Sequence, residues 1–126
     1  MTSDVDYDAR ILVVDDEPAN IALLTAILQG GGFTQITSTT DPREVLPLFR
    51  EQQPDLLMLD LMMPYLDGFQ VMEQVQGCIP AGSYLPILVL TADSTRATKQ
   101  RALAGGALDF LTKPVDTTEV LLRTKN

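Results

Sequence analysis

Three aspartates stand directly after short apolar segments, and their chemistry is that of a cation site. Asp15 and Asp16 follow one segment and Asp60 follows another, while Thr91 and Lys113 stand at the ends of later ones. If the carboxylates meet, two unit charges ~4 Å apart repel by roughly 4 kcal/mol at an effective dielectric of ~20. One lysine does not balance three such charges, so the cluster implies a bound cation. A few carboxylate oxygens completed by water favour Mg²⁺, with Mn²⁺ as an alternative.

The elements that must position these residues are predicted by the apolar segments themselves. Three segments are continuous rather than alternating, which is typical of parallel strands buried on both faces: Ile11–Val14, Leu56–Leu59 and Ile87–Leu90. Phe33–Ser38 and Asp109–Leu111 are less hydrophobic and fit strands at the edges of a sheet.

Helical spacing fills the intervals between these strands. The first apolar stripe stops at Gly30–Gly32, Asp41–Glu44 has the residues of a helix start, and Gly77–Pro86 is predicted to be a loop. The expected helices lie around Ile21–Leu28, Val45–Phe49, Phe69–Val75, Ser94–Ala104 and Thr117–Asn126. Strands that alternate with helices predict an α/β fold with a five-stranded parallel sheet in the order 2-1-3-4-5. Helices cover both faces, as in flavodoxin-like proteins.

This fold places the first and third strands side by side, so their carboxyl ends meet at the switch point where ligands bind. The aspartates after these strands then converge, and Lys113 and Thr91 reach the same edge. Taken singly, each residue has a simpler explanation. Asp16 or Glu17 could cap the first helix, Thr91 could be a strand-end residue, and Lys113 a solvated loop lysine. A set of three carboxylates is not explained in that way.

Composition excludes several classes of protein. The 126 residues suit one domain, with residues 1–9 as a polar tail and 10–126 as the folded unit. The chain has no His, so it lacks the residue for histidine catalysis and cannot carry a phosphohistidine. The lone Cys78 and the lack of a signal or membrane-spanning segment predict a cytoplasmic location. The net charge of −8 argues against direct nucleic-acid binding.

These residues together resemble the receiver domain of bacterial two-component response regulators. The resemblance extends from about residue 9 to 126, and the intervals between Asp16, Asp60, Thr91 and Lys113 match those of the family. The motifs that carry it are Ile11–Pro18, Leu59–Pro64 with Asp67-Gly68, Leu90–Ala92 and Phe110–Pro114.

The resemblance implies a role for each residue of the acidic site. Asp60 would be the phosphoacceptor, and Asp15 and Asp16 would hold Mg²⁺ beside it. The backbone carbonyl of Met62 would be a further metal ligand. Lys113, joined to Pro114 by the cis bond of the family, would contact a phosphoryl oxygen.

A second group would transmit the change. The Thr91 hydroxyl and the backbone N–H of Ala92 would bind other phosphoryl oxygens, and Phe110 would be an aromatic switch that turns inward when Thr91 moves. As a residue of a short strand, Phe110 could instead belong simply to the core. The methionines fit core packing. The side chains of Met62 and Asp93 stand where the family tunes the lifetime of the phosphoryl group.

The function expected from the resemblance is a phosphorylation-dependent switch without turnover of an external substrate. A sensor histidine kinase or a His-phosphotransfer protein would be the donor. Hydrogen bonds from Thr91 and Lys113 to the phosphoryl group would contribute ~1.5–3 kcal/mol each. Their sum approaches the ~5.5 kcal/mol that shifts a two-state population from 1:99 to 99:1, provided the unphosphorylated chain lacks both contacts. The readout would be the fourth helix, fifth strand and fifth helix, roughly residues 94–123, which would bind a protein partner, an output domain or a second copy.

Three other classes of protein are the alternatives. An aspartyl-phosphate hydrolase usually has an acid where this chain has Met62. An FMN carrier needs a phosphate loop where Asp15-Asp16-Glu17 stands. A non-phosphorylated docking module would keep the fold without the chemistry.

The segment Val120–Arg123 resembles receivers that continue into an effector such as a cyclic-dinucleotide phosphodiesterase.

Overall fold

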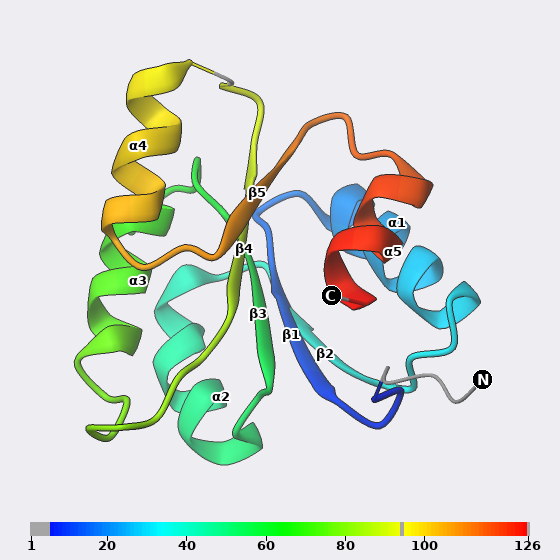
Figure 1. The fold of residues 1–126 in the computed structure, drawn as a ribbon, viewed down its shortest axis with the longest axis horizontal. Coiled ribbons are helices and arrows are strands. Elements are labelled where there is room, and N and C mark those ends of the chain that lie inside the picture. The colour runs from blue at the N-terminus through cyan, green and yellow to red at the C-terminus, as the bar shows by residue number, and fades with distance from the viewer. Residues whose placement is uncertain (1–5, 94, 126) are drawn as a thin grey trace.

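A computed structural model describes residues 6–93 and 95–125 of the chain. Strands and helices alternate along it, as the sequence predicted (Figure 1). The strands are β1 (Arg10–Val14), β2 (Gln35–Thr39), β3 (Leu56–Asp60), β4 (Ile87–Thr91) and β5 (Asp109–Thr112). The helices are α1 (Pro18–Gly30), the 3₁₀ turn η1 (Pro42–Glu44), α2 (Val45–Gln52), α3 (Gly68–Gln76), α4 (Arg96–Ala104) and α5 (Thr117–Lys125). Ser94 and Asn126 of the predicted helices, and residues 1–5 of the predicted tail, lie outside the described residues.

The five strands form one parallel sheet in the order β2-β1-β3-β4-β5, which confirms the predicted fold class. The register aligns the carboxyl ends of the central strands. Val14 pairs with Leu59, and Thr91 pairs with Thr112. The residues that follow β1 therefore lie beside the last residue of β3. The chain passes from β1 to β2 on one side of this point and from β3 to β4 on the other.

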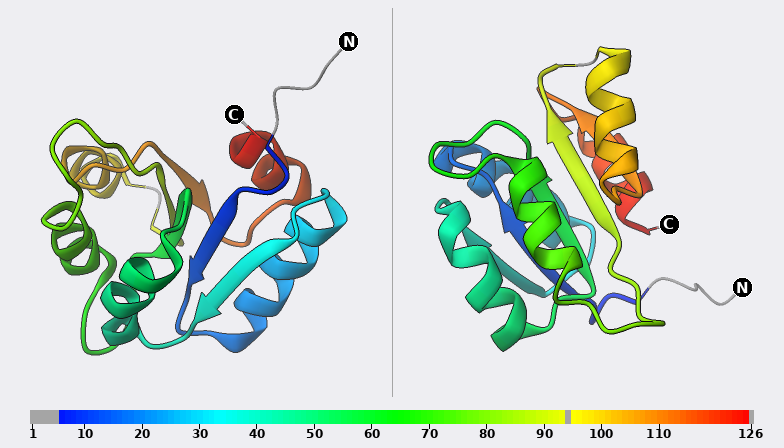
Figure 2. Two further views of the ribbon diagram at one scale, coloured as in Figure 1. Left: turned by 90° about the horizontal axis from the view of Figure 1, so that it is seen from below. Right: turned by 90° about the vertical axis from the view of Figure 1, so that its left-hand side faces the viewer.

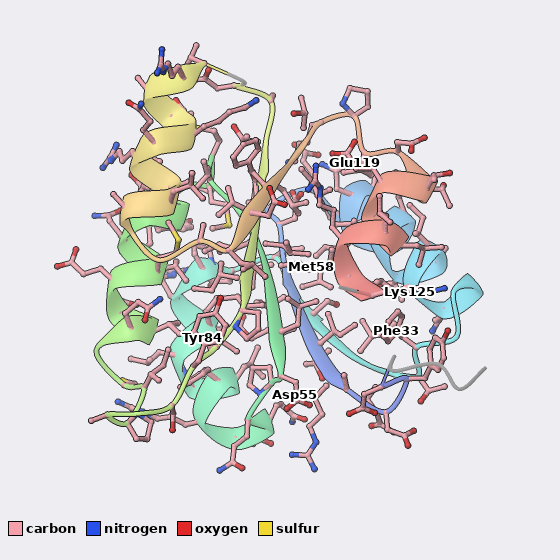
Figure 3. The ribbon with its side chains drawn as sticks, viewed as in Figure 1. Phe33, Asp55, Met58, Tyr84, Glu119 and Lys125 are labelled. Atoms are coloured by element: carbon pink, nitrogen blue, oxygen red, sulfur yellow. The ribbon has the colours of Figure 1, made fainter. Side chains whose placement is uncertain are left out.

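Helices cover the sheet on two sides, with α2, α3 and α4 on one face and α1 and α5 on the other (Figures 1 and 2). Alternate residues of each central strand enter different cores, because successive side chains point to opposite faces. On β3, Leu57 and Leu59 pack with residues of α2, α3 and α4, whereas Met58 packs with those of α1 and α5 (Figure 3). This double burial explains why the central strands are continuous apolar runs.

Two predicted boundaries differ from the structure. Asp41 does start a helical segment, since its carboxylate accepts a hydrogen bond from the Arg43 N–H at 2.9 Å, but that segment is a 3₁₀ turn. A continuous α-helix would need an N–H at Pro47 to bond the Arg43 carbonyl, and proline has none. Phe33 was predicted to begin a strand, but its N–H bonds the Leu28 carbonyl at 3.0 Å at the end of α1.

The described helices are too short or too polar to span a bilayer.

The start of α3 is fitted closely to the loop that follows β3. The Gly68 N–H bonds the Leu61 carbonyl at 3.0 Å. A Cβ on Gly68 would lie 2.6 Å from the Asp60 carbonyl oxygen and 2.7 Å from the Leu61 Cα. Both are backbone atoms, so the loop itself would have to move to admit a side chain.

We expect Gly68→Ala to lower the free energy of unfolding by about 1–3 kcal/mol, the usual cost of overpacking. Urea denaturation followed by circular dichroism measures this change. The control is Gly77→Ala at the other end of α3, where the nearest neighbouring atom would be 3.5 Å away. Equal stabilities of the two variants would contradict a tight fit at Gly68.

Candidate functional site

The three predicted aspartates lie together at the carboxyl edge of the sheet. Asp15 and Asp16 directly follow β1, and Asp60 is the last residue of β3. One carboxylate oxygen from each lies within 4.8 Å of the others. Asp15 is fully buried and Asp60 is 2% exposed, while Asp16 is half-buried. The sheet order therefore brings together residues that are far apart in the chain.

The backbone fixes the orientation of the two buried carboxylates in the same way. Asp15 Oδ1 accepts a hydrogen bond from the Glu17 N–H at 2.9 Å, and Asp60 Oδ1 accepts one from the Met62 N–H at 3.2 Å. In each case the donor lies two residues further along the chain, which is a turn that Asp favours. Glu17 occupies the N-cap of α1 without a side-chain hydrogen bond, so its side chain does not cap that helix.

The second oxygens of these carboxylates face Lys113. Its Nζ lies 2.9 Å from Asp15 Oδ2 and 3.2 Å from Asp60 Oδ2. The backbone of Lys113 is tied to β4 through a 2.8 Å hydrogen bond from its N–H to the Thr91 carbonyl, and the bond to Pro114 is cis. Lys113 is therefore the counter-charge of the acidic cluster, not a solvated loop lysine.

The ionisation of the cluster reflects its crowding. Burial raises the pKa of the Asp60 carboxyl to about 7, and the negative charge of Asp15 acts in the same direction. The Met62 N–H and the Lys113 ammonium lower the pKa of Asp60, without offsetting that rise. Burial alone would lower the pKa of Lys113, but the hydrogen bond to Asp15 and the charges of Asp60 and Asp15 raise it. One ammonium group thus faces more negative charge than it can neutralise.

The residues at this edge fit a hard divalent cation. Asp15 Oδ2 is buried, and its contact in the described part of the chain is the Lys113 ammonium group at 2.9 Å. All three side chains offer carboxylate oxygen, which Mg²⁺ prefers over softer donors. The Met62 backbone is held beside Asp60 through its N–H. The role of its carbonyl as a ligand stays a prediction.

Thr91 lies at the same edge, but its hydroxyl has other partners. Thr91 is 1% exposed. Its Oγ1 donates to the Asp93 carbonyl at 3.0 Å and accepts from the Asp93 N–H at 2.9 Å. Ala92, which follows Thr91, is exposed. Phe110 is partly buried and packs against the core on the α3 and α4 side. The roles of these three residues in phosphoryl contact and switching stay predictions.

Three contacts near the site were not predicted from the sequence, two made by Asp93 and one by Tyr65. The Asp93 carboxylate accepts hydrogen bonds from the N–H of Thr95, the N-cap residue of α4, at 2.9 Å and from the Thr98 hydroxyl at 2.7 Å. Tyr65, in the loop after β3, has a φ of 70°, and its ring lies 3.9 Å from the Arg43 guanidinium carbon. The spacing Asp93, Thr95, Thr98 carries a capping signal. Nothing in the sequence indicates the contact between Tyr65 and Arg43.

Comparison with known proteins agrees with this geometry, which is that of a doubly wound α/β protein with an acidic site at its switch point. The family model described as the response regulator receiver domain matches residues 11–125. The chain belongs to this family.

Two curated relatives illustrate the range of the family. Protein PilH of Pseudomonas aeruginosa is 37% identical over 118 residues, which are 94% of this chain and 95% of PilH. Response regulator PleD of Caulobacter vibrioides is 36% identical over 94% of this chain. The chain spans only 26% of the length of PleD.

Solved structures share the fold. Chemotaxis protein CheY4 of Vibrio cholerae has a TM-score of 0.83 at 31% identity, over 93% of this chain and 95% of that one. The receiver domain of the Saccharomyces cerevisiae response regulator Ssk1, crystallised with the histidine phosphotransfer protein Ypd1, has a TM-score of 0.81 at 25% identity. That match covers 93% of this chain and 86% of that one.

We expect Lys113→Gln, measured in EDTA, to lower the free energy of unfolding by about 1–3 kcal/mol. Two buried carboxylates would lose their counter-charge, and a fifth of the Lys113 side chain is exposed, which moderates the loss. Added Mg²⁺ should then raise the melting temperature of the variant more than that of the parent, because the cation no longer competes with the ammonium group. Lys125→Gln, an exposed lysine outside the cluster, is the control. Equal responses to Mg²⁺ would contradict a cation site at this edge.

Proposed function

We propose that the chain is a phosphorylation-controlled signalling switch and that Asp60 accepts the phosphoryl group. The observation that carries the proposal is the pairing of a buried Asp60 carboxylate with Lys113, next to two further carboxylates at the switch point of a receiver fold. The family makes signalling the general role. The acceptor, the cation, the donor and the responding face are the finer parts of the proposal.

The proposed transfer needs a phosphorylated histidine on another protein, because this chain has no His. An Asp60 oxygen attacks phosphorus and forms an O–P bond, while the P–N bond to the donor imidazole breaks and its electron pair returns to the ring. A sensor histidine kinase or a His-phosphotransfer protein has the required chemistry. The crystallised pair of the Ssk1 receiver domain and Ypd1 supports a partner of this kind.

Asp15 and Asp16, with Asp60 and the Met62 carbonyl, would hold Mg²⁺, or Mn²⁺ in its place. Such an ion supplies positive charge next to the oxygens of the transferring group. Lys113 Nζ, already 3.2 Å from Asp60 Oδ2, needs little movement to bind a phosphoryl oxygen. The Thr91 hydroxyl must first leave Asp93, after which it and the Ala92 N–H donate to other oxygens.

The responding surface in this proposal is formed by α4, β5 and α5. Leu103 on α4, Leu108 just before β5 and Leu122 on α5 are 47%, 51% and 60% exposed. They give this face apolar area that a protein partner, an attached output domain or a second copy could cover. We propose no direct contact with nucleic acid or membrane, in keeping with the net charge of −8, and a cytoplasmic location. Turnover of an external substrate is not part of the proposal, because Met62 occupies the position of a hydrolase acid.

We expect the chain, mixed with Mg²⁺ and acetyl phosphate, to gain one phosphoryl group in intact mass spectrometry, and Asp60→Asn to gain none. The amide lacks the nucleophilic carboxylate oxygen. Asp8→Asn, an exposed aspartate outside the cluster, is the control and should react like the parent. A parent protein that gains no mass with Mg²⁺ or Mn²⁺ would indicate a non-phosphorylated docking module instead.

We expect Asp16→Ala to abolish Mg²⁺-dependent phosphorylation while the melting temperature in EDTA stays near that of the parent. Asp16 is only half-buried, so its loss removes a metal ligand with little effect on the core. Near-normal phosphorylation of this variant would show that Asp16 does not hold the ion.

A further inference from the structure

Helix α4 is attached to the rest of the molecule by little apolar surface. Ala102 is the one buried residue of this helix, all of which the structure describes, and Leu103 beside it is 47% exposed. The neighbouring α3, on the same side of the sheet (Figure 1), buries Gly68, Val71, Met72 and Val75. Because hydrophobic stabilisation scales with buried apolar area, other contacts must hold α4 in place.

Cations supply two of these contacts. The Lys99 ammonium lies 4.5 Å from the centre of the Phe110 ring on β5, and the Arg101 guanidinium carbon lies 3.8 Å from the centre of the Phe69 ring on α3. Both distances are those of a cation–π interaction. No ion pair to Lys99 or Arg101 occurs among the residues that the structure describes. The aromatic rings are therefore the partners of these charges.

The pairing of β4 with β5 puts the Phe110 and Thr91 side chains on one face of the sheet. Thr91 pairs with Thr112, and Val89 pairs with Phe110. Residues two apart on a strand point to the same face, so the Thr91 and Phe110 side chains share the face covered by α4. Thr91 is also connected to the start of α4, through Asp93 and its 2.7 Å hydrogen bond from Thr98. Thr91 and Phe110 are thus both connected to α4, Thr91 through Asp93 and Thr98, and Phe110 through Lys99.

We propose that Lys99 is a positioning residue of the switch: its ammonium group holds the Phe110 ring against α4 in the unphosphorylated chain. This proposal rests on the proposed function, since it concerns the change that Asp60 phosphorylation produces. A contact made in one of two states favours that state, so Lys99 opposes the rearrangement that frees Thr91 for the phosphoryl group. Loss of the charge should favour the rearranged state by about two- to fivefold, the effect of one partly exposed cation–π contact.

The test combines a spectrum with a rate. The chain has four Phe residues, so 4-fluorophenylalanine labelling gives four fluorine resonances, of which Phe110→Leu and Phe69→Leu assign two. In Lys99→Gln, the Phe110 resonance should move toward its position in the parent treated with Mg²⁺ and phosphoramidate. The initial rate of phosphorylation by phosphoramidate should rise about two- to fivefold. Lys99→Arg keeps the cation and should restore both values to those of the parent.

Arg101→Gln is the matched control, because it removes a cation–π contact of the same helix from a ring outside the switch. It should move the Phe69 resonance and leave the rate unchanged. The proposal is overturned if Lys99→Gln leaves the Phe110 resonance in place, or moves it without a change in rate. It is also overturned if Arg101→Gln raises the rate equally, since general loosening of α4 would then be the cause. A parent that takes up no phosphoryl group refutes the proposed function and the switching role together, and the fluorine spectra then show separately whether Lys99 positions the ring.

Discussion

The electrostatics of the site are dominated by the repulsion between carboxylates that the strand order brings to one edge of the sheet. Asp15 and Asp60 are both buried at neighbouring strand ends and share one ammonium group, that of Lys113. Bringing charges out of water is costly unless they are paired and hydrogen-bonded. The two backbone N–H groups that bind their Oδ1 atoms, together with Lys113, meet part of that cost. The excess negative charge that remains is the charge that the proposed cation would offset.

The fold sustains this arrangement because the central strands of the sheet are deeply buried. On β1, which leads to Asp15 and Asp16, residues Ile11 to Val14 are buried. Every residue of β3 from Leu56 to Asp60 is buried, and β4 is equally enclosed. Both faces of the sheet are covered by helices, so these strands cannot shift to relieve the repulsion without opening two cores. Loops carry the more adaptable groups. Met62 and Tyr65, after β3, are 69% and 72% exposed.

The sequence was sufficient where a residue's position follows from strand order, and insufficient where it follows from side-chain contacts. The convergence of Asp15, Asp16 and Asp60 followed from the order 2-1-3-4-5, because parallel strands end at a common edge. The hydrogen bonds of Thr91 to Asp93 did not follow, since a hydroxyl at a strand end has several partners within reach.

Local turn chemistry accounts for the boundary errors in the same way. Phe is a residue type that is common in strands, but the Phe33 N–H donates to a carbonyl at the end of α1, before β2 begins. The hydrophobic pattern predicts the approximate position of each helix or strand. The residue at which each one begins depends on the hydrogen bonds at its ends. Helix α4 is the extreme case. Its one buried residue, Ala102, leaves almost no periodic signal, and its place is set by polar and cation–π contacts that the pattern does not encode.

The same contacts bear on the energy of the proposed switch. Lys113 already contacts Asp60, so its bond to a phosphoryl oxygen replaces an existing ion pair instead of adding a full ~1.5–3 kcal/mol. The Thr91 hydroxyl likewise exchanges its two bonds with Asp93 for a new one. The net free energy that these exchanges contribute to the switch is then well below the roughly 5.5 kcal/mol that shifts a population from 1:99 to 99:1. A switch driven by such a small difference works only if its resting state is held by contacts of similar size. The loosely buried α4, with its hydrogen bonds to Asp93 and its ring contact through Lys99, has contacts of that size.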